Sequence, residues 1–321
     1  MTRSLLLSGV AAIMLSSCIF MPPKEETKVG PDTKKEVPDS TDNETPTPAD
    51  GTGSGTTSPA DGEDTQNKDN GTSSGGTENN ISTKHGLSLV WQDEFDYSGV
   101  PDKTKWKYQT GAGGWGNNEL QNYLDNTSEA KTAVVEDNVL KIKAYKSDSK
   151  WYSARLNTKK SWKYGYIEAR LKVTDRKGAW PAFWMMPQNS VYGTWPDSGE
   201  IDIMENAPVT CGNHKVFSTL HAKGHYAGNG KSIGAKVYDE NLSAEWHTFG
   251  ILWTENKITA YYDDVERGSY ENNGNINDWP YKEDFYIILN LAIGGDLGGT
   301  GFVNSLNGEA EFLVDYVRVY Q

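Results

Sequence analysis

The sequence predicts an all-β fold, an antiparallel sandwich of two sheets, and three observations support this class. From residue 87 onward, short runs of β-branched and aromatic residues alternate with Gly, Asn, Asp and Pro, as is typical of strands separated by turns. Several runs alternate apolar and polar side chains with a period of two, as residues 166–173 do. No helical periodicity of useful length is found to connect parallel strands, so antiparallel pairing is expected.

The clearest predicted strands follow one another along this region, and each ends at turn-forming residues. They are Leu87–Gln92, Val139–Tyr145, Tyr164–Val173, Ala182–Met186, Glu200–Glu205, Val216–His221, His247–Thr254, Lys257–Tyr262, Phe285–Ala292 and Glu311–Tyr320. Together they place one folded domain at residues 85–321, which is within the usual length of a single β-sandwich.

The chain begins with a segment that is typical of export. Arg3 precedes an apolar run from Leu5 to Leu15, which is too short to span a bilayer and has the order of a secretory signal. Residues 15–18 read Leu-Ser-Ser-Cys and resemble a bacterial lipobox, in which cleavage before Cys18 leaves that cysteine to carry lipid. We therefore expect residues 1–18 to be a lipoprotein signal peptide; the alternative is an ordinary signal peptide with an incidental cysteine.

Residues 19–84 are expected to be a disordered tether. From residue 24 onward they contain almost no large apolar side chains, so burial cannot offset the chain entropy. Lys24-Glu25-Glu26 resembles the acidic surface-export signals of Bacteroidota lipoproteins, although such charge runs also serve solubility alone. We expect a lipid-anchored, monomeric protein of the bacterial cell envelope, at the outer membrane or cell surface.

Net charge and aromatic content limit the classes of molecule that the protein is expected to bind. The formal net charge of −13 disfavours nucleic acid and anionic lipid, whereas a neutral polysaccharide is indifferent to it. Eleven Trp and seventeen Tyr are too many for a core alone, and their rings suit stacking on sugars. With Cys18 lipidated, Cys211 is expected to be a small buried residue. Four indole side chains lie beside Gly, Pro or acidic residues, where cleft edges are expected: Trp115, Trp180, Trp184 and Trp195.

Residues 199–206, Gly-Glu-Ile-Asp-Ile-Met-Glu-Asn, place three acids in a segment that otherwise resembles a buried strand. Glu200 and Asp202 share one face of that strand, and a β-bulge at Ile203 or Met204 would bring Glu205 to the same face. Side chains leaning together would then approach the separation of about 5–5.5 Å found in retaining glycosidases. The alternatives are an acidic strand in solvent or an all-oxygen Ca²⁺ site.

A family resemblance rests on this motif and on several others in order. The run 195–205, Trp-Pro-Asp-Ser-Gly-Glu-Ile-Asp-Ile-Met-Glu, resembles the catalytic signature of glycoside hydrolase family 16, in the bulged form of bacterial laminarinases, which are endo-β-1,3-glucanases. Residues 91–95, 114–121, 153–156, 164–170, 180–184 and 315–320 resemble further family motifs, so the likeness covers nearly all of residues 87–321. It implies a concanavalin-like jelly roll.

The resemblance also implies roles for individual residues. Glu200 aligns with the nucleophile, Asp202 with the assisting acid and Glu205 with the general acid/base, and no cofactor is needed for this catalysis. Asn117 and Arg155 resemble residues that bind sugar hydroxyls on the nonreducing side, with a turn residue and a surface ion pair as the respective alternatives. His221 falls where relatives carry a histidine near the acid/base.

A structural Ca²⁺ is the one metal that the resemblance implies. Glu94 and Asp315 match positions that in many members ligate it, and carboxylate oxygens suit this ion. A zinc pair of His221 and His225 is not expected, because Gly224 interrupts any helix. Residues 294–299 lack the Trp that many laminarinases carry near Leu297, so the sugar subsite there is left open.

Two other functions compete with β-1,3-glucan hydrolysis. A family relative acting on mixed-linkage glucan, agar or carrageenan would share the acids, but sulfated substrates should demand more Arg or Lys near the motifs than Arg155 supplies. A non-catalytic glycan-binding sandwich displayed on the cell surface would need the aromatic cleft without three intact acids.

Overall fold

The computed structural model describes residues 82–125 and 131–321, so the predicted signal peptide, Cys18 and most of the tether lie outside the described residues. The folded domain begins slightly earlier than predicted. Thr83–Lys84 form strand β1, which pairs with Ser88 and Leu87 of β2 (Leu87–Asp93), whereas the sequence analysis placed residues 83 and 84 in the tether. The correction follows from the turn at His85 and Gly86, whose positive φ angles let the chain fold back.

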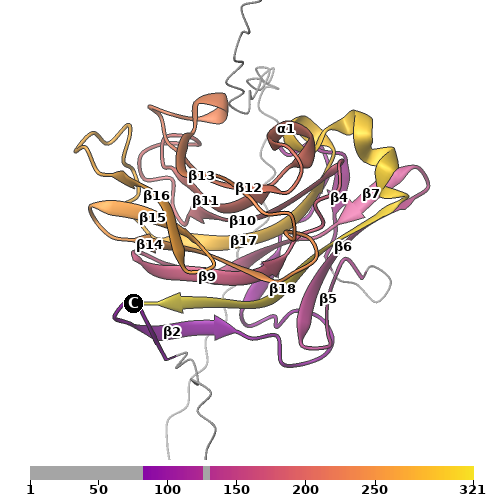
Figure 1. Ribbon diagram of the computed structural model, residues 1–321, viewed down its shortest axis with the longest axis horizontal. Coiled ribbons are helices and arrows are strands. Elements are labelled where there is room, and N and C mark those ends of the chain that lie inside the picture. Colours follow the sequence, from indigo (N-terminus) through magenta and orange to yellow (C-terminus); the bar gives the residue numbers. More distant parts are fainter. Residues whose placement is uncertain (1–81, 126–130) are drawn as a thin grey trace, which may run out of the picture. The chain divides into compact units, whose positions relative to one another are not determined.

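Two sheets form the sandwich that was predicted (Figure 1). The seven-stranded sheet has the order β13-β12-β11-β10-β17-β8-β3. Its strands are β3 (Trp106–Tyr108), β8 (Arg155–Trp162), β10 (Ala179–Pro187), β11 (Glu200–Asn206), β12 (Lys215–His221), β13 (Lys231–Tyr238) and β17 (Phe285–Ile293).

The eleven-stranded sheet has the order β16-β15-β14-β9-β18-β6-β7-β4, with β1, β2 and β5 paired beside this path. Its further strands are β4 (Gln121–Tyr123), β5 (Ala133–Glu136), β6 (Val139–Ser147), β7 (Lys150–Ser153), β9 (Gly165–Lys172), β14 (His247–Trp253), β15 (Lys257–Tyr262), β16 (Val265–Glu271) and β18 (Glu309–Tyr320). Side chains that alternate toward the partner sheet form one continuous apolar core between the layers.

Pairing is antiparallel throughout the named strands with one exception. Strand β4 runs parallel to β7, with Gln121 opposite Trp151 and Tyr123 opposite Ser153. Because β5 and β6 lie between these two strands in the chain, their connection is long enough to allow parallel pairing. The predicted antiparallel sandwich is confirmed, and this edge is a local exception to its antiparallel pairing.

Helical structure in the described residues is limited to short turns, as expected. These are α1 (Pro208–Cys211), α2 (Gly295–Gly298) and the 3₁₀ segments Ala227–Asn229 and Thr300–Leu306. No helix among the described residues has the length and apolar character required to cross a membrane. Cys211 is buried at the end of α1, as predicted.

The two ends of the domain lie side by side at the edge of the eleven-stranded sheet. Strand β18 pairs with β2, and the backbone of Gln321 exchanges two hydrogen bonds with Ser88, with N···O distances of 2.9 and 3.0 Å. In Figure 1 this edge lies on the opposite side of the domain from β11 and β12.

Candidate active site

A cleft of about 420 Å³ opens on the outer face of the seven-stranded sheet. Its lining brings together every predicted catalytic and sugar-binding residue, and also Trp115, although these positions are spread over more than a hundred residues of sequence. They are Trp115, Asn117, Arg155, Trp180, Trp184, Trp195, Glu200, Asp202, Glu205 and His221.

A β-bulge in β11 explains how the three acids reach one face. Met204 pairs with Phe183 of β10 and Asp202 pairs with Trp184, so Ile203 has no partner of its own on that strand. Ile203 and Met204 both enter the core between the sheets, and Glu205 therefore returns to the cleft side. This is the bulge that the motif required.

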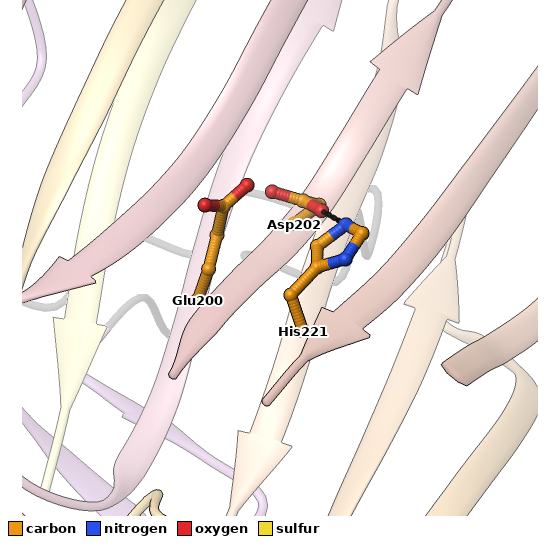
Figure 2. A group of neighbouring side chains, drawn as sticks. All are labelled: Glu200, Asp202 and His221. Carbon is orange, nitrogen blue, oxygen red and sulfur yellow. Dashed lines mark ion pairs between the residues drawn. The ribbon is translucent and has the colours of Figure 1, made fainter. Parts of the chain in front are cut away.

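Glu200 and Asp202 project together into the space that His221 of β12 faces (Figure 2). The Nε2 atom of His221 lies 3.0 Å from Oδ2 of Asp202, and both side chains are largely buried. The ligand atoms of these three residues lie within 4.8 Å of one another, the only such cluster with metal-binding side chains among the described residues. His221 therefore contacts the carboxylate of Asp202, which lies between the two glutamates along β11.

Burial shapes the electrostatics of the acids. Burial, and then the charge of Asp202, raises the pKa of Glu200 to about 8. Burial also raises the pKa of Asp202 to about 7, and it raises the pKa of Glu205 well above its usual value, with the Asp202 charge adding to the effect. The rise in pKa favours the protonated form of Glu205, which is the form that a general acid requires.

Two indole groups hold the two glutamates. Trp195 donates from Nε1 to Oε2 of Glu200 at 2.6 Å, and Trp180 donates from Nε1 to Oε1 of Glu205 at 2.9 Å. Both were predicted as sugar-stacking residues, and the sequence did not indicate that their N–H groups are directed at the acids. A donor placed on a carboxylate stabilises its ionised form.

The other end of the cleft, which we call the Arg155 end, is built around stacked rings. The guanidinium of Arg155 lies over Trp115 and Trp184, 4.9 and 4.6 Å from the ring centroids, and its Nε donates to Gln109 at 2.5 Å. Asn117 and the buried acid Glu119 complete this end. Glu119 was missed, because its burial in a Gly-rich loop cannot be inferred from neighbouring residues.

The predicted calcium ligands have other partners in the structure. Glu94 binds Arg318 through both carboxylate oxygens, at 2.8 and 2.7 Å, and Asp315 binds Arg170 at 2.8 Å. An ion using these side chains would have to displace guanidinium groups, so the arrangement does not favour a carboxylate-ligated ion. His225 contacts backbone carbonyls with both ring nitrogens, which fits the expectation that it forms no zinc pair with His221.

Carboxyl groups held in an aromatic-walled cleft carry out acid/base and nucleophilic steps at glycosidic bonds, and this fold and site define the class of the glycoside hydrolases. Comparison with known proteins gives the family. The model of the "Glycosyl hydrolases family 16" matches residues 120–315, and the chain belongs to this family.

Named relatives agree with this assignment. A "Beta-glucanase" of Rhodothermus marinus is 39% identical over 73% of this chain and 85% of its own length. A "Glucan endo-1,3-beta-glucosidase" of Cryptopygus antarcticus is 38% identical over 72% of this chain and 90% of its own. The solved laminarinase from Rhodothermus marinus superimposes with a TM-score of 0.68 at 37% identity, covering 73% of this chain and 97% of that one. The jelly-roll fold is thereby confirmed, and the protein is an enzyme that acts on polysaccharide.

Proposed function

We propose that this protein is a retaining endo-β-1,3-glucanase of the laminarinase type, with Glu200 as nucleophile and Glu205 as general acid/base. The observation that carries the proposal is the pair of glutamates on one cleft face, each held by its own indole donor. Similarity to named β-1,3-glucanases supports the choice of substrate.

The geometry supports a double displacement. Glu200, ionised and held by Trp195, attacks the anomeric carbon while Glu205 donates its proton to the leaving oxygen. Glu205 then removes a proton from the water that releases the sugar and is ready for the next cycle. Asp202, contacted by His221, adds negative charge between the glutamates and so helps to keep Glu205 protonated until the first step.

The catalytic assignment is tested by two substitutions and one stereochemical measurement. Glu200→Gln and Glu205→Gln should each lower turnover on β-1,3-glucan by orders of magnitude while the fold is kept, because a carboxamide neither attacks nor protonates. Proton NMR of the first product should show the β anomer, since two displacements retain configuration. An initial α product would overturn the retaining mechanism.

Substrate choice is tested by measuring reducing-end release from laminarin, lichenan, agarose and carrageenan side by side. We expect laminarin to be cleaved fastest, with lichenan second, because mixed-linkage glucan also contains β-1,3 bonds. Preference for agarose or carrageenan would support the alternative of another family member. Binding of laminarin by a folded wild-type protein without any cleavage would instead support the glycan-binding alternative.

We also propose that the enzyme is a monomeric lipoprotein of the bacterial cell envelope, anchored through Cys18 at the outer membrane or cell surface. Cys18→Ser should stop lipid labelling and release the protein from the membrane fraction, and unchanged attachment would refute the lipobox. Deleting residues 1–81 should leave an active domain that elutes as a monomer, because the described fold begins at residue 82.

A structural Ca²⁺ near Glu94 and Asp315 stays a proposal drawn from the family resemblance. Because Arg318 and Arg170 bind these carboxylates, an ion would have to compete with both guanidinium groups. This competition raises the apparent dissociation constant for Ca²⁺, so more Ca²⁺ is needed to reach the roughly 2.7 kcal/mol of stabilisation that mass action gives at a hundred times that constant.

A further inference from the structure

A buried carboxylate that the double displacement does not use lies at the Arg155 end. Glu119 is only 8% exposed, yet it lines the cleft. Three groups contact it: Nδ2 of Asn117 at 3.0 Å, Nε2 of Gln121 at 2.5 Å and the hydroxyl of Tyr123 at 3.3 Å. A buried acid of this kind requires an account, because burial alone disfavours its charge.

The direction of one of these hydrogen bonds is fixed by the backbone. The Oε1 atom of Gln121 accepts from the N–H of Ile293 at 2.7 Å. A backbone N–H can only donate, so the carbonyl end of the Gln121 amide is committed to it. The NH₂ end of Gln121 must then face Glu119 as a donor.

A second direction is fixed from the opposite side of the cleft floor. The indole N–H of Trp184, which is donor only, binds Oδ1 of Asn290 at 2.7 Å. The NH₂ group of Asn290 therefore faces the hydroxyl of Tyr123, at 3.0 Å, and donates to it. Because that oxygen accepts from Asn290, the Tyr123 proton is directed at Glu119.

Gln121 and Tyr123 are thus fixed as donors to Oε2 of Glu119, and Asn117 donates to Oε1, so both carboxylate oxygens accept hydrogen bonds. We propose that Glu119 is a positioning residue for substrate: as a carboxylate it fixes Asn117 and, through Tyr123 and Asn290, the ring of Trp184. This sets the affinity for the sugar chain at the Arg155 end. The proposal deepens the proposed function and rests on it.

The consequence for sugar binding follows from Asn117 and Trp184, the two cleft residues that the hydrogen bonds from Glu119 reach. Asn117 gives one amide N–H to Glu119, so its Oδ1 is the end of the amide that accepts from a sugar hydroxyl. Trp184 is held by Asn290 at its indole nitrogen and carries Arg155 over its ring. Loss of the Glu119 carboxylate would free the Asn117 side chain and loosen the ring of Trp184. The three acids of β11 would keep their own contacts.

The test is Glu119→Gln, which keeps the size of the side chain but forces an NH₂ group against one of the three donors. Kinetics on a β-1,3-linked hexasaccharide should show KM raised about ten- to 150-fold, the range for a lost hydrogen bond to a charged group, with kcat within threefold of wild type. Glu119→Asp, which keeps the charge, should recover part of the loss. The double variant Asn117→Ala/Glu119→Gln should be less impaired than the product of the two single effects, because the part of the Glu119 effect that acts through Asn117 is already lost in Asn117→Ala, while the part that acts through Trp184 remains.

Two controls separate positioning from plain stability. Glu168→Gln changes another buried acid, in β9 of the eleven-stranded sheet, and should lower Tm without raising KM. Asn118→Gly removes the neighbouring loop contact to Asp296, at a position with φ of 56°, and should leave KM within threefold. Effects of Asn117→Ala and Glu119→Gln that multiply independently, or a Tm loss with unchanged KM, would overturn the proposal. If wild type does not cleave β-1,3-glucan, the proposed function has failed, and the same variants are measured on the glycan that it does cleave.

Discussion

Replacing Trp195 with Phe tests whether the indole donor controls the ionisation of the nucleophile. Trp195→Phe keeps an aromatic ring at the cleft edge but removes the N–H that lies 2.6 Å from Oε2 of Glu200. Burial already raises the pKa of Glu200 to about 8, and the Trp195 hydrogen bond opposes that rise. Without the donor, the ionised carboxylate loses stabilisation, so the pKa of Glu200 should rise further.

The size of this shift follows from the strength of the lost bond. A hydrogen bond to a charged group contributes roughly 1.5–3 kcal/mol, and we use the lower value because the Trp195 side chain is 38% exposed. At about 1.36 kcal/mol per pKa unit, the shift is about one unit. Catalysis needs ionised Glu200, so the acid limb of kcat/KM should move upward by about one pH unit, and activity well below that limb should fall about tenfold.

The assay is kcat/KM on laminarin from pH 5 to 10, with Trp180→Phe as the matched control. Trp180 donates to Glu205, which must be protonated, so its loss should move the alkaline limb upward and leave the acid limb in place. The limbs report the coupled acids as a group, and for this reason we compare limb positions between variants. An acid limb that does not move in Trp195→Phe, or the same shift in both variants, would refute the reasoning.

Three further outcomes are expected. Glu205→Gln should raise Tm more at pH 9 than at pH 5. Burial raises the pKa of Glu205 in the folded protein above its value in the unfolded chain, so the stability that wild type gains from the bound proton is lost as pH rises through the folded pKa. An equal change in Tm at both pH values would contradict this. Deleting Met204 removes the extra residue of the bulge and leaves all three acids on one face, so hydrolysis should stay measurable. Deleting Ile201 turns Glu200 away from the cleft and should abolish hydrolysis. Equal activity of the two folded variants would argue against the bulge. Melting curves with Ca²⁺ and with chelator should show a small calcium-dependent rise in Tm that Asp315→Ala removes, and an insensitive wild type would leave Glu94 and Asp315 as partners of arginine only.

The sequence predicted strands wherever one strong local pattern decides the structure. Strand β9 alternates cleanly, and β17 is largely apolar apart from Asn290, so both were found close to their observed bounds. Strands β8 and β16 were missed, because Lys, Asn, Glu and Gly within them weaken the alternation, and pairing with neighbouring strands decides their conformation.

The residues of the candidate site also fall into two groups, those that a local pattern predicts and those that depend on distant partners. The three acids and the bulge follow from a seven-residue strand, because parity along a strand fixes which face each side chain takes. The role of Glu119 depends on hydrogen bonds that join it to Gln121 and Tyr123 and extend from there to Asn290, far along the chain. Such partners become visible only once the sheets are assembled.

The hydrogen-bonded pairing of Ser88 with Gln321 holds the beginning and the end of the folded domain next to each other. A short linker across this junction would suffice for a circular permutant, and its strands would keep their neighbours. The same junction would let the enzyme be spliced into an exposed turn of another protein, with entry and exit at one point. Because this point lies on the sheet opposite the cleft, a host protein or a solid support joined there would leave the groove open to long polymers.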